Sequence, residues 1–164
     1  MKGGEEDALL DEIERIYRER YPVFLRVAAS VAGNADAGND AVQDGFADAV
    51  RSRRSYRGRG SLEAWIWRAV VNAARDRRRP PQSELPADLV AGPGSDVESG
   101  ALRRAISRLP ERQRLAIFLR YFADLDQRSI AEALGIRPGT VAATLHAARE
   151  SLRGSLEEVE SWQR

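Results

Sequence analysis

Arginine, glycine and tryptophan residues are concentrated in one stretch of the sequence, residues 54–79. Within residues 51–80 there are ten arginines and two acids, a local charge of +8. Arginines contact phosphates and guanine edges, and an indole can stack on an unpaired base. The stretch therefore predicts a nucleic-acid surface, and the tryptophan pair beside a Gly/Arg loop favours single-stranded DNA. A solvated basic helix at the end of a domain is the alternative interpretation.

The same stretch has the spacing of an amphipathic helix. Apolar side chains recur on one face of it, namely Leu62, Trp65, Ile66, Ala69, Val70 and Ala73. Ser61 precedes them at an N-cap position. The opposite face carries Arg68, Asn72, Arg75 and Arg78. Because Trp67 lies off the apolar stripe, we expect Trp67 on the exposed side and Trp65 in the core.

A second candidate for DNA binding lies within residues 125–153. Ala131, the turn glycine Gly135 and then Val141 have the spacing of a helix-turn-helix. Alanine lets two helices cross closely, and glycine tolerates a positive φ. Thr140 is expected to cap the second helix. A helical hairpin without a role in DNA binding is the alternative.

The composition of the 164 residues excludes several kinds of chemistry. There is no cysteine, hence no disulfide, thiol catalysis or cysteine-based zinc site, and the single histidine, His146, cannot form a cluster. Since the sequence holds no nucleophile–base set, phosphate loop or metal-ligand spacing, we expect no enzyme, no cofactor and no metal. There is no signal peptide and no apolar run near ~20 residues, so we expect a cytoplasmic protein without a membrane partner.

The net charge of +1 hides an uneven distribution along the chain. Residues 1–50 carry −6, residues 81–100 carry −4 and residues 101–164 carry +3, around the basic middle. Such an alternation predicts separate surfaces for separate partners.

Helical spacing elsewhere predicts an all-α fold of two small helical domains. We expect helices at residues 5–20, 23–32, 36–54, 99–108 and 111–122, besides those already described, with Pro22 separating the first two. Residues 80–98 hold four prolines and no basic residue and are expected to form a flexible linker. The domains are thus placed at 5–79 and 99–156, and the acidic tail at 157–164 either extends the last helix or docks on a partner.

Four segments together resemble an extracytoplasmic-function (ECF) sigma factor of the sigma-70 family. They are DAVQDGFADA at 40–49, YRGRGSLEAWIWRAVVNAARDRRR at 56–79, LPERQRLAIFLRYF at 109–122, and the segment 125–153. They follow the order of the family and cover residues 9–153. The resemblance implies a protein that binds core RNA polymerase through its β′ clamp and β flap regions, directs it to promoters and helps to open the DNA. Members of this family are often held by an anti-sigma factor that covers these faces, although nothing in this sequence identifies one.

The helix at 40–49 resembles the surface of the family that docks on the β′ clamp. The resemblance implies that the polymerase-binding residues are Asp40, Gln43, Asp44 and Phe46. An acidic face suits a basic partner, although a solvated acidic surface would look the same in sequence. Gly45 interrupts this helix and would permit close approach of a partner helix.

The stretch from Ser55 to Arg79 resembles the part of the family that recognises and melts the −10 element. Such a task needs a pocket for a flipped base and donors for a single strand. The implied contacts are Ser55, Tyr56, Arg57 and Arg59 in the loop and Trp67, Arg68, Asn72 and Arg75 on the helix. The family's linker passes through the polymerase, which is the role implied for residues 80–98.

The recognition helix of the helix-turn-helix departs from the family, which often carries Lys or Arg at positions where this chain has alanine. Alanine can touch a thymine methyl group but makes no bidentate guanine contact. We therefore expect weak readout of the −35 element in double-stranded DNA. The candidate residues are Arg137, Thr140, Ala143, Thr144, His146 and Arg149. An exposed His146 without a base contact is an equal alternative.

A polymerase-independent helix-turn-helix regulator is the competing function. It predicts tight binding of duplex DNA by the protein alone. A sigma factor instead predicts poor binding of promoter DNA without core polymerase.

Overall fold

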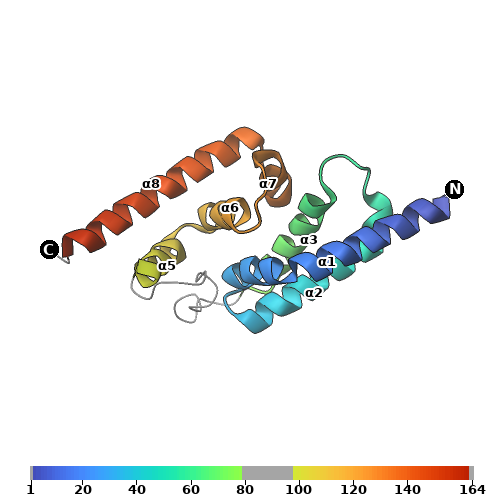
Figure 1. Cartoon of the computed structure of the whole chain (residues 1–164), viewed down its shortest axis with the longest axis horizontal. Helices are drawn as coiled ribbons and strands as arrows, with labels where there is room; N and C mark the ends of the chain where they lie inside the picture. The colour runs from blue at the N-terminus through green and yellow to red at the C-terminus, as the bar shows by residue number, and fades with distance from the viewer. Residues whose placement is uncertain (1, 79–97, 163–164) are drawn as a thin grey trace.

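The computed structural model describes residues 2–78 and 98–162, which form seven α-helices and one short 3₁₀ helix and contain no strand (Figure 1). The N-terminal half holds α1 (Lys2–Ala32), α2 (Ala35–Ser52), the 3₁₀ helix η1 (Arg53–Ser55) and α3 (Leu62–Asp76). The C-terminal half holds α5 (Glu98–Arg108), α6 (Glu111–Tyr121), α7 (Gln127–Leu134) and α8 (Pro138–Trp162). The predicted all-α class is confirmed. Residues 80–97 of the predicted linker lie outside the described ranges.

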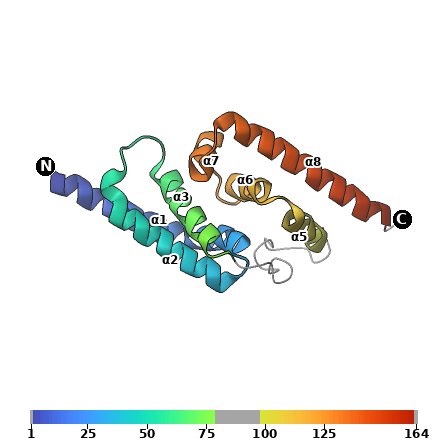
Figure 2. The ribbon, with the colours of Figure 1, turned by 180° about the vertical axis from the view of Figure 1, so that it is seen from behind.

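Helix α1 continues through Pro22, so the predicted break at this residue is wrong. A proline inside a helix removes one backbone hydrogen bond. Apolar packing on both sides of the proline compensates, because Ile16, Phe24 and Val27 are all buried. α1 is therefore one long rod that packs against both α2 and α3 (Figure 2).

A glycine and a capping side chain make the turn from α1 to α2. Gly33 has a φ of 99°, and Asn34 accepts a hydrogen bond through Oδ1 from the Ala37 N–H at 2.8 Å. Asparagine at this position satisfies a backbone donor that the first turn of a helix leaves unpaired. α2 thus starts at a fixed point and lies alongside α1.

Helices α2 and α3 cross closely at Gly45. A Cβ atom added at Gly45 would lie 2.6 Å from the Cα of Val70, closer than real Cβ atoms come. The close approach expected at Gly45 therefore exists, but the helix that uses it is α3 of the same chain rather than a partner's helix.

The helix-turn-helix is formed by α7 and α8 as its spacing predicted. Asp126 caps α7 by accepting the Ser129 N–H at 2.7 Å. Gly135 ends α7 in the left-handed region with a φ of 65°, and Ile136 donates its N–H to the Ala131 carbonyl at 2.9 Å. This is the glycine-terminated helix end that satisfies the last carbonyls.

Helix α8 differs from the expectation at its first turn but not at its end. It starts at Pro138, so Thr140 lies inside the first turn and the expected cap at Thr140 is wrong. Proline suits a first helical position because no helix partner exists there for its missing N–H. At the other end the backbone stays helical to Trp162, so the acidic tail extends the last helix.

The two helical regions pack against each other, with α3 against α7 and α1 against α6. Their buried apolar side chains form one connected cluster, to which Trp67 and Val71 contribute from the first region and Leu119 and Leu134 from the second. No helix in the described part of the chain is long and apolar enough to cross a membrane.

Candidate nucleic-acid interface

The basic loop and the start of α3 form a defined structure. Ser61 caps α3 by accepting the Ala64 N–H at 3.3 Å, as predicted. The Tyr56 hydroxyl donates to the Gly60 carbonyl at 2.8 Å and closes the loop on itself. Gly58 and Gly60 have φ values of 64° and 86°, a region that side-chain-bearing residues rarely adopt. The glycines of the loop thus allow its tight turns, and the exposed Arg57 and Arg59 each precede one of them.

A groove runs between α2, η1 and α3 and collects three of the predicted −10 residues. Its wall includes Ser55, Arg68 and Asn72, together with the half-buried Trp65. Tyr56 extends the aromatic surface, since its ring centroid lies 5.6 Å from that of Trp65. Arginine, amide, hydroxyl and indole groups on one wall are the groups that hold a single strand and stack its bases. The carboxylates of Asp44 and Asp48 face them from α2.

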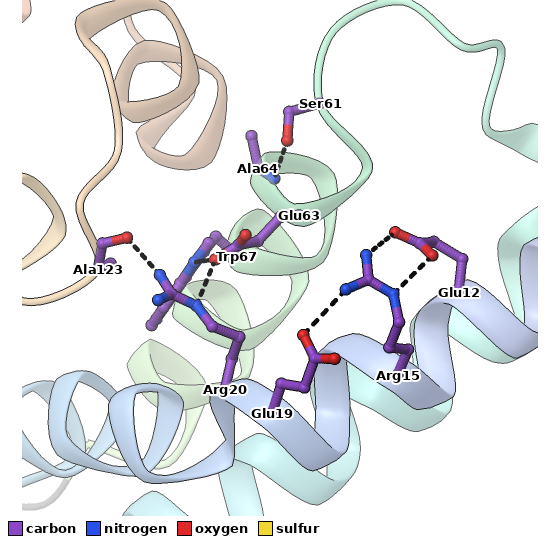
Figure 3. Close-up of polar contacts among 9 residues, drawn as sticks. All are labelled: Glu12, Arg15, Glu19, Arg20, Ser61, Glu63, Ala64, Trp67 and Ala123. Atoms are coloured by element: carbon purple, nitrogen blue, oxygen red, sulfur yellow. Dashed lines mark hydrogen bonds and ion pairs between the residues drawn. The ribbon is translucent and has the colours of Figure 1, made fainter.

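Trp67 lies in the core, so its expected place on the exposed face is wrong. It is fully buried, and its ring stacks on that of Phe24 with centroids 3.8 Å apart. Its indole N–H donates to Glu63 Oε1 at 3.3 Å (Figure 3). The reason is that α3 is covered on two sides, by α1 and α2 and by α7, so its buried arc is wider than one stripe. Trp65 is the indole that reaches the groove.

The predicted polymerase-binding residues divide between surface and interior. Asp40, Gln43 and Asp44 are exposed on α2. Phe46 is 6% exposed and makes edge-to-face contacts with Tyr17 and Phe24, with centroids 5.0 and 4.9 Å apart. Phe46 thus packs inside the fold and holds α2 against α1, whereas the other three predicted residues face solvent.

The exposed carboxylates of α2 already have a basic partner within the chain. Arg77, just after α3, donates through Nε to Asp44 Oδ2 at 2.8 Å and lies 3.5 Å from Asp40 Oδ2. The hydrogen bond to Asp44 raises the pKa of Arg77 above its usual value. Since these side chains are largely exposed, the two pairs contribute little to stability and weaken with salt. A basic partner of this face competes with Arg77.

The predicted −35 residues all lie on or just before α8. Arg137, Ala143, His146 and Arg149 are exposed, while Thr140 and Thr144 are half-buried. The Thr144 hydroxyl donates to the Thr140 carbonyl at 2.7 Å, so its donor is engaged within the helix. Arg149 donates to the Tyr121 hydroxyl at 2.9 Å, with its guanidinium 5.9 Å from the ring centre. Tyr121 orients Arg149, a link that sequence spacing alone does not reveal.

A second groove brings parts of the two predicted DNA surfaces together. Thr140, Ala143 and Thr144 of α8 line it on one side, and Arg75 lines it on the other. Arg75 donates through Nε to Glu111 Oε1 at 2.9 Å, so it lies apart from Arg68 and Asn72 in the first groove. Sequence reasoning missed Glu111 and Arg77, because the partners of both are far away in the sequence.

Comparison with known proteins assigns both halves to described regions. A family model described as Sigma-70 region 2 matches residues 16–82, and one described as Sigma-70, region 4 matches residues 99–152. The ECF RNA polymerase sigma factor SigM of Mycobacterium tuberculosis is 32% identical over 148 residues, which cover 85% of this chain and 74% of SigM.

Two solved structures share the fold. CnrH in complex with the cytosolic domain of CnrY has a TM-score of 0.69 at 21% identity, over 89% of this chain and 88% of CnrH. The sigma factor RpoE from Bartonella quintana, in complex with the anti-sigma factor NepR, has a TM-score of 0.65 at 22% identity, over 88% of this chain and 98% of RpoE.

Proposed function

This chain belongs to the extracytoplasmic-function sigma factors of the sigma-70 family, and from that premise we propose how its surfaces divide the work of transcription initiation. The protein binds core RNA polymerase, directs it to specific promoters and promotes opening of the DNA. It is an initiation factor that acts through the polymerase, and it is located in the cytoplasm together with the polymerase. Residues 5–79 bind the polymerase and the −10 element, and residues 99–156 bind the −35 element. The linker at 80–98 joins these two domains, and the acidic tail at 157–164 follows the second domain.

The exposed acidic face of α2 docks on the β′ clamp of the polymerase. Asp40, Gln43 and Asp44 supply the contacts, and the buried Phe46 supports the helix from beneath. A carboxylate face favours association with a basic surface and raises the association rate at low salt. The C-terminal half meets the β flap region.

The groove between α2 and α3 receives the opened −10 strand, and it is the observation that carries the proposal. Ser55, Arg68 and Asn72 line one wall and place donors beside Trp65. A half-buried indole at the groove suits stacking of an unpaired base, and guanidinium and amide groups suit its phosphates and base edges. The loop that carries Tyr56, Arg57 and Arg59 borders this groove and holds the flipped base. Trp65 takes the place that the sequence assigned to Trp67.

Duplex contact at the −35 element rests on α8. Arg137 and Arg149 anchor phosphates, Ala143 meets a thymine methyl group, and His146 is exposed for a base edge. Without an arginine at a base-reading position the readout is weak, and affinity depends on salt through the phosphate contacts.

An anti-sigma factor is proposed as the regulatory partner. The support is that the RpoE structure named above is a complex with such a factor. The surfaces it would cover are the acidic face of α2 and the face of the helix-turn-helix.

Run-off transcription with core polymerase on a pool of genomic promoter fragments tests the function. We expect discrete transcripts that require this protein, that are lost in Asp44→Asn and that are reduced in Arg68→Ala. Asp11→Asn is the matched control, because Asp11 is an exposed carboxylate on α1 outside the proposed surfaces. No transcript, together with tight duplex binding by the protein alone, would instead support the independent regulator.

A further inference from the structure

Two half-buried tyrosines of α1 lie one helical turn apart and reach side-chain amides of α2. The Tyr17 hydroxyl accepts a hydrogen bond from Nε2 of Gln43 at 2.8 Å, and the Tyr21 hydroxyl donates to Oδ1 of Asn39. Residues four apart lie on the same face of a helix, and the numbers fall along α2 as they rise along α1. The two bonds are therefore successive links between two antiparallel helices that pack side by side.

The ring of Tyr17 is held in place independently of its hydroxyl. It makes edge-to-face contacts with the rings of Tyr21 and Phe46, with centroids 5.3 and 5.0 Å apart. Phe46 is buried and makes the same kind of contact with Phe24. Aromatic pairs of this geometry are favourable beyond the area that they bury. The hydroxyl of Tyr17 is thus presented at a fixed point beside α2, and replacement of this tyrosine by phenylalanine should remove the hydrogen bond without moving the ring.

The hydrogen bond decides which atom Gln43 offers to a partner. Gln43 is exposed on the same face of α2 as Asp40 and Asp44. Because Tyr17 engages the amide nitrogen of Gln43, the carbonyl oxygen is the group that remains for a partner, and carboxylates are acceptors only. The face therefore presents three acceptors, which suit the donors of an arginine or lysine side chain. Arg77 shows this chemistry within the chain, because its guanidinium pairs with both carboxylates.

A glutamine side chain on a helix surface is otherwise flexible. Without the bond to Tyr17, Gln43 would sample several rotamers and both orientations of its amide. Ordering such a side chain at an interface costs free energy, and fixing it before association removes part of that cost. The hydroxyl of Tyr17 thus prepares Gln43 for binding.

We propose that Tyr17 is a positioning residue for polymerase docking, which holds Gln43 with its carbonyl oxygen toward a basic side chain of the polymerase. The inference rests on the proposed function for the identity of the partner. The link between Tyr21 and Asn39 has the opposite sense, because there the carbonyl oxygen is the engaged atom. Asn39 is half-buried and is not among the expected polymerase contacts, so this second link supports only the packing of α1 on α2 and provides an internal control.

Nuclear magnetic resonance tests the geometry without the polymerase. The side-chain amide signals of Gln43 are identified by their loss in Gln43→Met. We expect Tyr17→Phe to shift these signals and Tyr21→Phe to leave them at their parent positions. Both variants keep their rings and should remain folded, which urea unfolding checks. Unchanged Gln43 signals in Tyr17→Phe would overturn the inference.

Binding to immobilised core polymerase tests the consequence. We expect Tyr17→Phe and Gln43→Met to bind roughly three- to ten-fold more weakly, as for one lost hydrogen bond, mainly through faster dissociation. Tyr21→Phe is the matched control, because it also removes one hydroxyl from α1, and it should bind as the parent chain does. The double variant Tyr17→Phe/Gln43→Met should bind no more weakly than Gln43→Met alone, because a positioning residue has no further effect once the side chain that it positions is gone.

A third variant tests the acceptor role of Gln43. The carboxylate of Gln43→Glu can accept from the Tyr17 hydroxyl and offers only acceptors to a partner. We therefore expect Gln43→Glu to bind core polymerase at least as tightly as the parent chain. A weaker affinity of this variant would show that the partner needs the amide nitrogen as a donor, and it would overturn the inference.

The outcomes separate the inference from the function on which it rests. If Asp44→Asn and Gln43→Met both bind polymerase as the parent chain does, the proposed docking face on α2 is wrong. If these two variants bind more weakly but Tyr17→Phe behaves as Tyr21→Phe does, the docking face stands and the positioning role of Tyr17 is overturned. Losses of Tyr17→Phe and Gln43→Met that add in the double variant would overturn this role as well.

Discussion

Trp67 lies almost parallel to Phe24, with ring centroids 3.8 Å apart and an angle of 19° between the planes. The stack joins the middle of α3 to α1, and neither ring is exposed to solvent. Two residues away, Trp65 faces the −10 groove. The two tryptophans of α3 therefore have different roles, and replacing each of them by alanine should have a different effect.

Trp67→Ala should lower the free energy of unfolding by about 3–5 kcal/mol, as expected for removal of a large buried side chain. Urea unfolding followed by far-ultraviolet circular dichroism measures this loss. Trp65→Ala is the matched control and should lose less stability, because part of its ring is exposed, but it should bind a single-stranded oligonucleotide more weakly. Equal losses of stability in the two variants would contradict the assignment.

The position of Trp67 also marks the limit of what the sequence could predict. Apolar spacing predicts the helix and the cap at Ser61, and both are confirmed. Of the predicted buried stripe only Ile66 and Val70 are buried, and the other members are half-buried, namely Leu62, Trp65, Ala69 and Ala73. An indole off the stripe was read as exposed, because a helix packed on one side buries a single stripe. The structure stacks Trp67 on Phe24 of α1 and packs α7 on α3 as well, so the off-stripe indole was the signal of a wider buried face.

Gly45→Ala should destabilise the protein by about 1–3 kcal/mol, because the added methyl group would meet the backbone of Val70 at 2.6 Å. Gly154→Ala, in the interior of α8, meets nothing within 4 Å and should stabilise by about 0.5–1 kcal/mol through helix propensity. Thermal denaturation of both variants gives the comparison. A gain in stability from Gly45→Ala would show that α2 and α3 can move apart without loss.

Asp126 should make the stability of the helix-turn-helix depend on acid pH. The Ser129 N–H lowers the pKa of its carboxyl from the usual 3.8. A carboxyl with a lower pKa in the folded state stabilises above its unfolded pKa, and this contribution disappears as the pH falls through the folded value. Asp126→Asn retains a capping side chain but carries no charge. The wild type should therefore be more stable than Asp126→Asn at neutral pH, and this difference in the free energy of unfolding should disappear as the pH falls below about 4.

Urea midpoints of the wild type and Asp126→Asn at pH 7, 4 and 3 measure this dependence. Asp126→Ala at pH 7 provides the scale, with an expected loss of about 0.5–2 kcal/mol for a missing cap. An advantage of the wild type that grows on acidification would contradict the assignment of the low pKa to Asp126.

Arg77→Gln should bind core polymerase more tightly, because it releases the carboxylates of Asp40 and Asp44 for the partner. The gain should be at most about five-fold, because an exposed ion pair is weak, and it should shrink with added salt. Arg51→Gln controls for the change in net charge, because Arg51 pairs with Asp48 on α2. Equal gains from both variants would point to general electrostatics rather than to competition by Arg77.

The remaining differences from the sequence prediction share a physical cause. Pro22 was expected to end a helix by its local chemistry, yet buried residues on both sides of it carry α1 through. Phe46 was grouped with the acidic residues around it, although its ring packs on Tyr17 and Phe24. Glu111 and Arg75 are 36 residues apart, and spacing within one helix carries no information about such a pair. Local patterns predicted the helices and tertiary packing decided the rest.

Arg77 and Arg78 are adjacent in sequence, and they pair with carboxylates on different helices. Arg77 binds Asp44 of α2, and Arg78 binds Glu111 of α6. A single peptide unit thus links the face proposed to meet the polymerase with a contact that joins the end of α3 to the C-terminal half. Coupling between two binding equilibria is reciprocal. By whatever factor docking of the polymerase at Asp44 weakens the contact of Arg78 with Glu111, that contact in turn weakens the binding of the protein to the polymerase.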